Sequence, residues 1–193
     1  MLKRRPRSWV ASTSAAIALL VAGCGESKVS QCNRLAEVVN QTQGFMQEFE
    51  TEIASFSSNA AQVESLDDIK GAASQYITAV DKVVTNLDTL TTDLEGTELA
   101  DETLVSYRDN YIEVVKGFST ALQGASSAMS IVGGVESEAD LPAKIEESQK
   151  QTMDAVSSIQ ELSVQESTII GEVNTYCGAD ATSVGGGGEA EGE

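Results

Sequence analysis

The strongest constraint on the fold is an apolar rhythm that runs without a miss through residues 66–95. Steps of three and four residues separate its apolar positions, which are Leu66, Ile69, Ala73, Tyr76, Val80, Val83, Leu87, Leu90 and Leu94. This spacing places all of them on one face of an α-helix, in a heptad pattern. Ser65 and Asp68 resemble a capping box at the start of this helix, with Asp in the place of the usual Glu or Gln.

Three further segments have the same spacing and predict three more amphipathic helices. In residues 28–57 the stripe consists of Cys32, Leu35, Val39, Thr42, Met46, Phe49, Ile53 and Phe56. In residues 98–132 it consists of Leu104, Tyr111, Val115, Phe118, Leu122, Ala125, Met129 and Val132. The fourth segment ends near residue 177, and its stripe consists of Ile145, Thr152, Val156, Ile159, Ile170, Val173 and Cys177, with Glu166 as an interruption.

Turn and cap residues set the boundaries of these helices. Gly96 marks a turn, and Thr97 is the expected N-cap of the third helix. Gly133–Gly134 ends that helix. Asp140 stands before Leu141–Pro142 and marks the start of the fourth helix, because proline is tolerated in a first helical turn.

Four long helices with short connections predict an all-α fold, an antiparallel up-down-up-down four-helix bundle over residues 30–178. Cys32 lies at the start of the first helix and Cys177 at the end of the fourth, and these ends meet at one pole of such a bundle. We therefore expect a disulfide between Cys32 and Cys177 that closes the bundle. The alternative, a metal-binding or redox pair of thiols, lacks neighbouring ligands in the sequence.

The beginning of the chain predicts export and attachment to a membrane. Residues 3–7 are mostly basic, and residues 9–22 form an apolar run that is too short to span a bilayer. Residues 21–24, Val-Ala-Gly-Cys, resemble the lipobox of bacterial lipoproteins. The resemblance implies that residues 1–23 are a cleaved lipoprotein signal peptide and that Cys24 carries acyl chains such as palmitate. The alternative is an ordinary secretory signal in which Cys24 is incidental.

Charge and composition predict how the rest of the chain is attached and where it lies. After residue 23 the chain has 8 basic and 30 acidic residues, a net charge of −22, which repels nucleic acid and anionic lipid headgroups. The lipid anchor must then hold the protein on the membrane, through an acylated tether at residues 24–29. We expect an extracytoplasmic location, on a periplasmic or lumenal face or on the cell surface. Residues 179–193 lose apolar periodicity and predict a disordered Gly/Glu tail.

The absence of histidine excludes most catalytic and metal chemistry for this chain. No catalytic residue, metal ligand set or cofactor is predicted, and the protein is not expected to be an enzyme. Arg108 lies on the apolar stripe of the third helix, either as a buried functional cation or with its charge reaching water; we expect the second. Acidic side chains near the helix starts could attract cations weakly, although the carboxylates at the first turns are explained by the helix dipole.

These observations favour a structural or protein-interaction module that is bound to a membrane and binds another protein. The alternative is a helical bundle that binds a small ligand or cations. In architecture the predicted protein is similar to small acylated four-helix lipoproteins of the photosystem lumen in cyanobacteria. The segment Ser30–Leu35 remotely resembles uncharacterised cyanobacterial lipoproteins.

Overall fold

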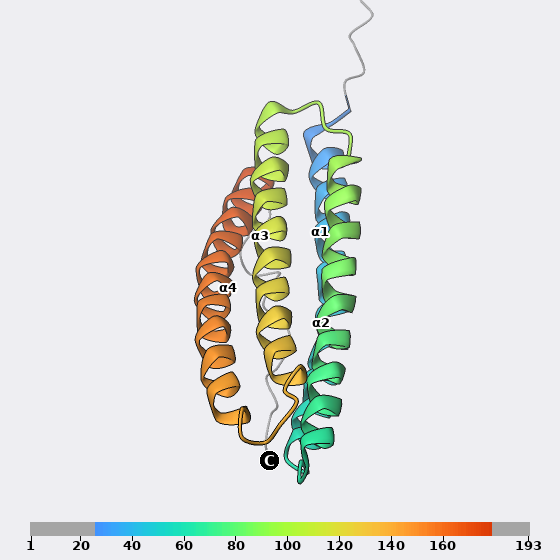
Figure 1. The fold of residues 1–193 in the computed structure, drawn as a ribbon. Coiled ribbons are helices and arrows are strands. Elements are labelled where there is room, and N and C mark those ends of the chain that lie inside the picture. Colours follow the sequence, from blue (N-terminus) through green and yellow to red (C-terminus); the bar gives the residue numbers. More distant parts are fainter. Residues whose placement is uncertain (1–25, 179–193) are drawn as a thin grey trace, which may run out of the picture.

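The structure is a computed structural model that describes residues 26–178, and this part of the chain is helical without strands (Figure 1). The four helices are α1 (Lys28–Ala60), α2 (Leu66–Glu95), α3 (Glu102–Gly133) and α4 (Leu141–Cys177). They correspond to the four segments that the apolar spacing predicts. The predicted signal peptide, the Cys24 anchor and the predicted tail at 179–193 lie outside the described residues.

Caps explain where the helices begin and correct one predicted boundary. The capping box before α2 is confirmed, because Ser65 Oγ accepts from the Asp68 amide at 3.2 Å and Asp68 Oδ2 accepts from the Ser65 amide at 3.0 Å. The prediction that Thr97 caps the third helix is wrong. Thr97 donates its hydroxyl proton to the Asp93 carbonyl at 2.7 Å and so completes α2, whereas Asp101 caps α3.

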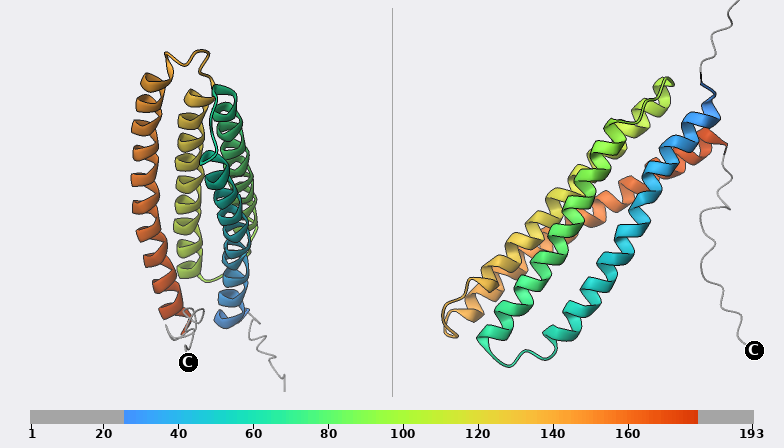
Figure 2. Two further views of the ribbon diagram at one scale, coloured as in Figure 1. Left: turned by 90° about the horizontal axis from the view of Figure 1, so that it is seen from below. Right: turned by 90° about the vertical axis from the view of Figure 1, so that its right-hand side faces the viewer.

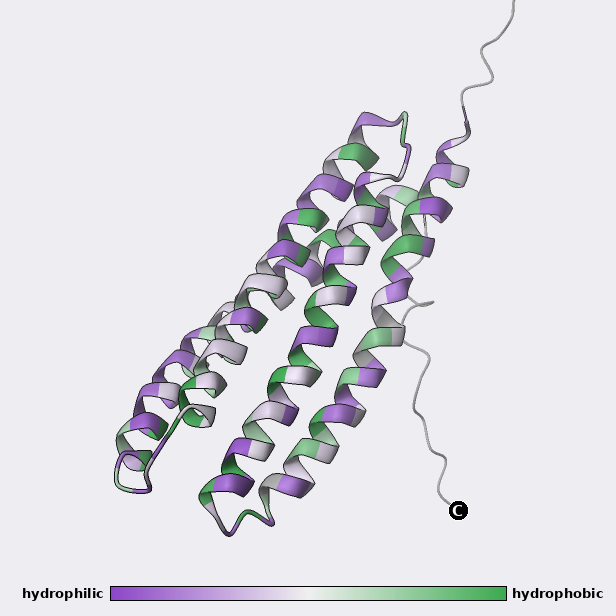
Figure 3. Ribbon diagram, turned by 45° about the vertical axis from the view of Figure 1, so that its right-hand side comes forward, coloured by the Kyte–Doolittle hydropathy of each residue, from purple (hydrophilic) through white to green (hydrophobic). Residues whose placement is uncertain are grey.

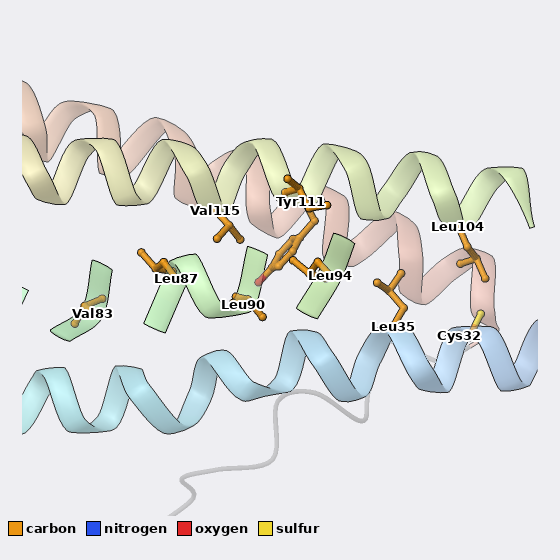
Figure 4. Packing of buried hydrophobic residues seen from close by; sticks show 10 residues of the cluster. Cys32, Leu35, Val83, Leu87, Leu90, Leu94, Leu104, Tyr111 and Val115 are labelled. Carbon is orange, nitrogen blue, oxygen red and sulfur yellow. The ribbon is translucent and has the colours of Figure 1, made fainter. Parts of the chain in front are cut away.

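The hydrophobic core lies mainly between α2 and α3. Its most buried large side chains are Leu90, Leu94, Leu104 and Val80, with at most 1 % of their surface exposed. Figure 4 shows the leucines of α2 facing Tyr111 and Val115 of α3, with Leu35 of α1 on the other side. By contrast, among the side chains that the structure describes, the buried hydrophobic residues of the outer helices are few: Cys32 and Leu35 in α1, and Ala155 in α4. The outer helices therefore flank an inner pair.

The helices pack in chain order, α1 on α2, α2 on α3 and α3 on α4, while α1 and α4 contact each other much less. The α2–α3 connection lies at one end of the molecule and the other two connections lie at the opposite end (Figure 1). We call these the cysteine end, with Cys32, Cys177 and residues 96–101, and the far end, with residues 61–65 and 134–140. Polar and apolar residues alternate around each helix (Figure 3).

The two cysteines lie together, as the sequence predicts. The Cα atoms of Cys32 and Cys177 are 6.0 Å apart and their sulfur atoms are at disulfide-bond distance, across a sequence separation of 145 residues. Near this pair α1 and α4 converge, and toward the far end they separate (Figure 2, right). The contact between the first and last helix is thus concentrated at the cysteine end.

Hydrogen bonds hold the α2–α3 connection onto α1 and α4. The buried Gln31 Oε1 accepts from the amides of Ala100 and Asp101 at 2.7 and 2.9 Å. Tyr176 of α4 donates its hydroxyl proton to Asp101 at 2.8 Å. Arg108 donates to the Thr97 carbonyl at 3.0 Å and forms an ion pair with the exposed Asp109 at 2.7 Å, so its guanidinium group lies near the surface and also holds the connection to α3.

Candidate functional site

The candidate site is a groove between α1 and α4, formed by two adjoining cavities whose floor is α3 together with α2. The cavity nearer the cysteine end has a volume of about 220 Å³ and is lined by Leu35, Ala36, Val39, Asn40, Thr42, Tyr107, Tyr111, Glu166, Ile169, Ile170, Val173 and Asn174. The second cavity has a volume of about 230 Å³ and is lined by Thr42, Phe49, Val83, Leu87, Leu90, Tyr111, Val115, Phe118, Leu122, Ile159, Ser163 and Glu166. Both walls are mainly apolar, as in small-molecule sites.

Three polar side chains belong to both cavities and form what we call the polar junction: Thr42, Tyr111 and Glu166. Tyr111 is only 3 % exposed, and its hydroxyl donates to Glu166 Oε1 at 2.9 Å. Its oxygen lies 3.5 Å from the hydroxyl of Thr42. The junction thus links α1, α3 and α4 in the middle of an otherwise apolar groove.

Helix register explains why these residues meet. Thr42 follows Cys32 by ten residues, and Glu166 precedes Cys177 by eleven. At 1.5 Å per residue, both therefore lie roughly 15 Å from the cysteine pair along their helices. The pairing of Cys32 with Cys177 consequently places Thr42 and Glu166 at the same level, on either side of Tyr111.

The environment of Tyr111 keeps its phenol protonated. Burial raises the pKa of the Tyr111 phenol well above its usual range; the nearby Thr42 hydroxyl lowers this pKa, and the charge of Glu166 raises it. A protonated phenol can donate only one hydrogen bond, and the carboxylate of Glu166 receives it. The tyrosine therefore acts as a neutral donor that orients Glu166 and not as a base.

The hydroxyl groups around the groove already donate their protons in hydrogen bonds within the protein. Thr42 donates to the Val39 carbonyl at 2.7 Å, and Ser163 donates to the Ile159 carbonyl at 2.9 Å. Tyr111 donates its hydrogen bond to Glu166. These three hydroxyl groups therefore have only their lone pairs left for a further partner. The polar junction and its surroundings consequently present acceptors to the groove.

Glu166 is the only charged residue in the walls of the two cavities, among the residues that the structure describes. Its Oε1 accepts from Tyr111, and for Oε2 the described residues provide no hydrogen bond. The amides of Asn40 and Asn174 line the cavity nearer the cysteine end and offer donors as well as acceptors. A single negative group therefore lies at the centre of the groove, with amides toward one end.

Helix α4 also carries exposed apolar side chains outside the two cavities. Val156 is 46 % exposed and precedes the groove residue Ser163 by seven residues, so both lie on the same side of the helix. Met153 and Val164 are 72 % and 68 % exposed. Apolar side chains are thus exposed on α4 outside the two cavities.

The sites predicted from sequence lie apart from this groove or outside the described residues. Cys32 and Cys177 lie together, but neither lines the two cavities of the groove. Cys24 is not among the described residues. Within residues 26–178, no three or more acidic or cysteine side chains converge so that they could hold a metal ion. None of the described helices combines the length and the hydropathy that a membrane-crossing segment needs.

The polar junction is not predicted from the sequence, although its three residues stand on the predicted stripes. In the apolar pattern Glu166 is only an interruption of the fourth stripe, while Thr42 and Tyr111 are ordinary stripe positions. The signal that was available is the common distance of Thr42 and Glu166 from the two cysteines. A charged residue at an inward position requires a partner, and its level in the bundle indicates which helix provides one.

In comparisons with known proteins, no family model, no curated protein and no solved structure matches the chain. The geometry of the groove therefore carries the functional proposal.

Proposed function

We propose that this protein is a non-catalytic, lipid-anchored binding protein outside the cytoplasm that takes a small, mainly apolar ligand into the groove between α1 and α4. The observation that carries the proposal is the pair of apolar cavities that share Thr42, Tyr111 and Glu166. An apolar cavity of about 150 Å³ can already hold benzene. The two cavities, at about 220 and 230 Å³, have room for a ligand that extends past the junction.

The proposed working unit is an antiparallel up-down-up-down bundle with a disulfide between Cys32 and Cys177. Connections at alternating ends and the meeting of α1 and α4 at the cysteine pair support this arrangement. In such a bundle the weak contact between α1 and α4 beyond the cysteine end leaves space that a ligand can fill. The helix pair α2–α3 holds the core whether or not the groove is occupied.

The proposed anchor is Cys24, eight residues before Cys32. It would hold the cysteine end near the membrane and leave the groove and the far end accessible. Replacing Cys24 by Ser is expected to move the protein from the membrane fraction to the soluble fraction and to remove the mass of the acyl chains. A Cys24→Ser protein that stays in the membrane fraction would contradict the anchor.

Binding to the groove can be tested with a neutral fluorescent dye such as Nile red. The full chain with Cys24→Ser is used, so that its own acyl chains do not compete. We expect saturable binding with a blue shift of the dye emission. Ile170→Trp in the first cavity and Ile159→Trp in the second are expected to weaken it at least tenfold, because the larger ring fills the space.

Val164→Trp is the matched control, since it makes the same kind of change on the same helix at a residue that is 68 % exposed and outside both cavities. Its dye affinity should remain that of the parent protein. Circular dichroism melting shows which variants keep the fold. Absence of saturable binding, or equal loss in the folded cavity and control variants, would refute a ligand site in the groove.

A second candidate function is binding of a protein partner, which the exposed apolar residues of α4 favour. Met153 and Val164 would contribute most of this contact because they are the most exposed. A photo-crosslinking residue at position 153 should then trap a partner on the native membrane, whereas the same residue at the neighbouring position 154 should not. Equal yields at both positions would argue against a contact through Met153.

A further inference from the structure

We propose that the ligand of the groove is an amphiphile with one primary ammonium group, held by the acceptors of the polar junction, and with an aliphatic chain or aromatic ring in the apolar cavities. This inference rests on the proposed function and adds the chemistry of the ligand. Glu166 binds the ammonium group directly, while Tyr111 and Thr42 offer further acceptor oxygens. The apolar part lies against residues such as Ile170 and Val173.

The first argument is the distribution of protons at the junction. The hydroxyl protons of Tyr111, Thr42 and Ser163 are donated to Glu166 or to backbone carbonyls. A ligand group that meets these oxygens must therefore bring its own protons. A primary ammonium group has three N–H donors and no acceptor, which matches a cluster of acceptors in number and kind.

The second argument is charge. Among the described residues, Glu166 is the one charged side chain in the walls of both cavities, so a ligand carboxylate or phosphate would face a like charge there with no cation from these residues to compensate it. An ammonium group instead forms a charge-assisted hydrogen bond with the carboxylate. The chain as a whole is strongly acidic, with a formal net charge of −18, which raises the local concentration of cationic ligands.

The third argument is the position of the charge between two apolar cavities. Tyr111 holds one oxygen of Glu166 by the 2.9 Å hydrogen bond and so fixes the carboxylate between them. A ligand whose ammonium group binds there has apolar surface to either side for the rest of its structure. Neither a free metal ion nor a fully polar polyamine would use these apolar walls.

The experiment compares four ligands with the same eight-carbon chain: octylamine, octanol, octanoate and octyltrimethylammonium. Each displaces Nile red from the Cys24→Ser protein at about 0.15 M salt, which screens long-range surface charge. We expect octylamine to bind at least tenfold more tightly than octanol, as for a hydrogen bond to a charged group. Octanoate should bind more weakly than octanol.

The quaternary ammonium compound separates hydrogen bonding from charge without any mutation. It keeps the positive charge but has no N–H donor, so it should lose most of the advantage that octylamine has over octanol. Binding as tight as that of octylamine would overturn the assignment of acceptor oxygens to the ammonium group. Equal affinity of octylamine and octanol would overturn the charge preference.

Glu166→Gln tests the residue that carries the inference, with Glu161→Gln as its control. Both substitutions remove one negative charge from α4, but Glu161 lies outside both cavities. We expect Glu166→Gln to reduce the preference for octylamine over octanol about tenfold with little change for octanol, and Glu161→Gln to change neither. An equal reduction in both variants would refute a role of Glu166.

The outcomes for the ligand class and for the groove can be told apart. If neither Nile red nor octanol binds to the folded parent protein, the proposed function fails and this inference fails with it. If octanol displaces Nile red but octylamine binds no better, the groove remains a ligand site and only the ammonium assignment is lost. The comparison of ligands on the parent protein remains decisive even if Glu166→Gln does not fold.

Discussion

The cysteine end and the far end of the same four helices are held together in different ways. At the cysteine end, α1 and α4 share the cysteine pair, and Gln31 and Tyr176 bind the α2–α3 connection between them. Toward the far end, α1 contacts α2 through Lys82 and Glu52, at 2.6 Å, and through Phe56 and Tyr76, whose ring centroids are 5.3 Å apart. These contacts hold α1 to α2 and not to α4.

This difference explains why a groove exists in so simple a fold. A bundle that packed α1 against α4 along its whole length would fill the space around Glu166 with side chains. Here the ties between these helices are concentrated at the cysteine end, so the groove opens beyond it. A binding site thus arises from incomplete closure, with the core between α2 and α3 providing stability.

Removal of the cysteine pair should have the largest effect on stability, because this pair connects α1 and α4 at the cysteine end. The double variant Cys32→Ser and Cys177→Ser is expected to lose about 4–5 kcal/mol of unfolding free energy. The reason is that a disulfide between these residues closes a loop across a sequence separation of 145 residues. Guanidinium chloride unfolding of the oxidised protein measures the loss. Reduced parent protein is the control and should unfold like the variant. Free thiols in peptide mapping without reductant would contradict the prediction.

Truncation of one apolar side chain at each end should have unequal effects. Leu104, near the cysteine end, is fully buried, whereas Ile145, near the far end, is 37 % exposed. Leu104→Ala should cost about 2–5 kcal/mol, as for deletion of core methyl groups, and Ile145→Ala less than about 1 kcal/mol. Both substitutions remove three carbon atoms. Equal shifts of the denaturation midpoint would show that the far end is packed as tightly as the cysteine end.

Helical glycines at the two ends should respond alike, because their effect is local. Gly71 lies near the far end and Gly171 near the cysteine end, and a Cβ atom at either would meet no atom within 4 Å. Each change to Ala should therefore stabilise the protein by about 1 kcal/mol, the difference in helix propensity.

Gly117 is the control for this comparison, since a Cβ atom there would come within 2.6 Å of the side chain of Leu162. Gly117→Ala should gain less than the other two substitutions because Leu162 has to move. Thermal melting measures all three variants. A stabilisation confined to one end would indicate that the ends unfold separately.

The four helices could be predicted from sequence because apolar spacing and caps are local signals. The pairing of Cys32 and Cys177 could be predicted as well, since an even number of helices returns the chain to its starting end. The start of α3 could not: Thr97 and Asp101 are both good N-cap residues, but in the structure Asp101 accepts from the amides of Thr103 and Leu104, whereas Thr97 donates to the Asp93 carbonyl.

The groove could not be predicted because it depends on how far two outer helices separate. The stripe of α4 is weaker than that of α2, which agrees with its few buried residues, Ser148 and Ala155. Yet the spacing does not reveal on which side the bundle stays open. Glu166 was visible as an exception in the pattern, but its partner Tyr111 became evident only from the packing of α3.

The smallest expected effect is a difference in pH dependence between the capping aspartates at the two ends. Hydrogen bonds from the Leu104 amide and from Tyr176 lower the pKa of Asp101, and the Ser65 side chain and nearby amides lower that of Asp68. A carboxylate with a lowered pKa stabilises the folded protein at pH values above its unfolded-state pKa of about 3.9. This contribution is lost as the pH falls through its folded-state pKa. Asparagine still caps a helix but does not titrate.

Asp101→Asn and Asp68→Asn should therefore destabilise the protein at neutral pH, and this difference from the parent protein should be smaller at about pH 3, below the unfolded pKa. The effect should be larger for Asp101, because its carboxylate also binds Tyr176 and so connects α4 to α3, whereas the partners of Asp68 are all in its own cap. Urea unfolding at both pH values measures the difference. An equal or larger effect of Asp68→Asn would mean that the link from α4 to Asp101 adds nothing to the closure of the cysteine end.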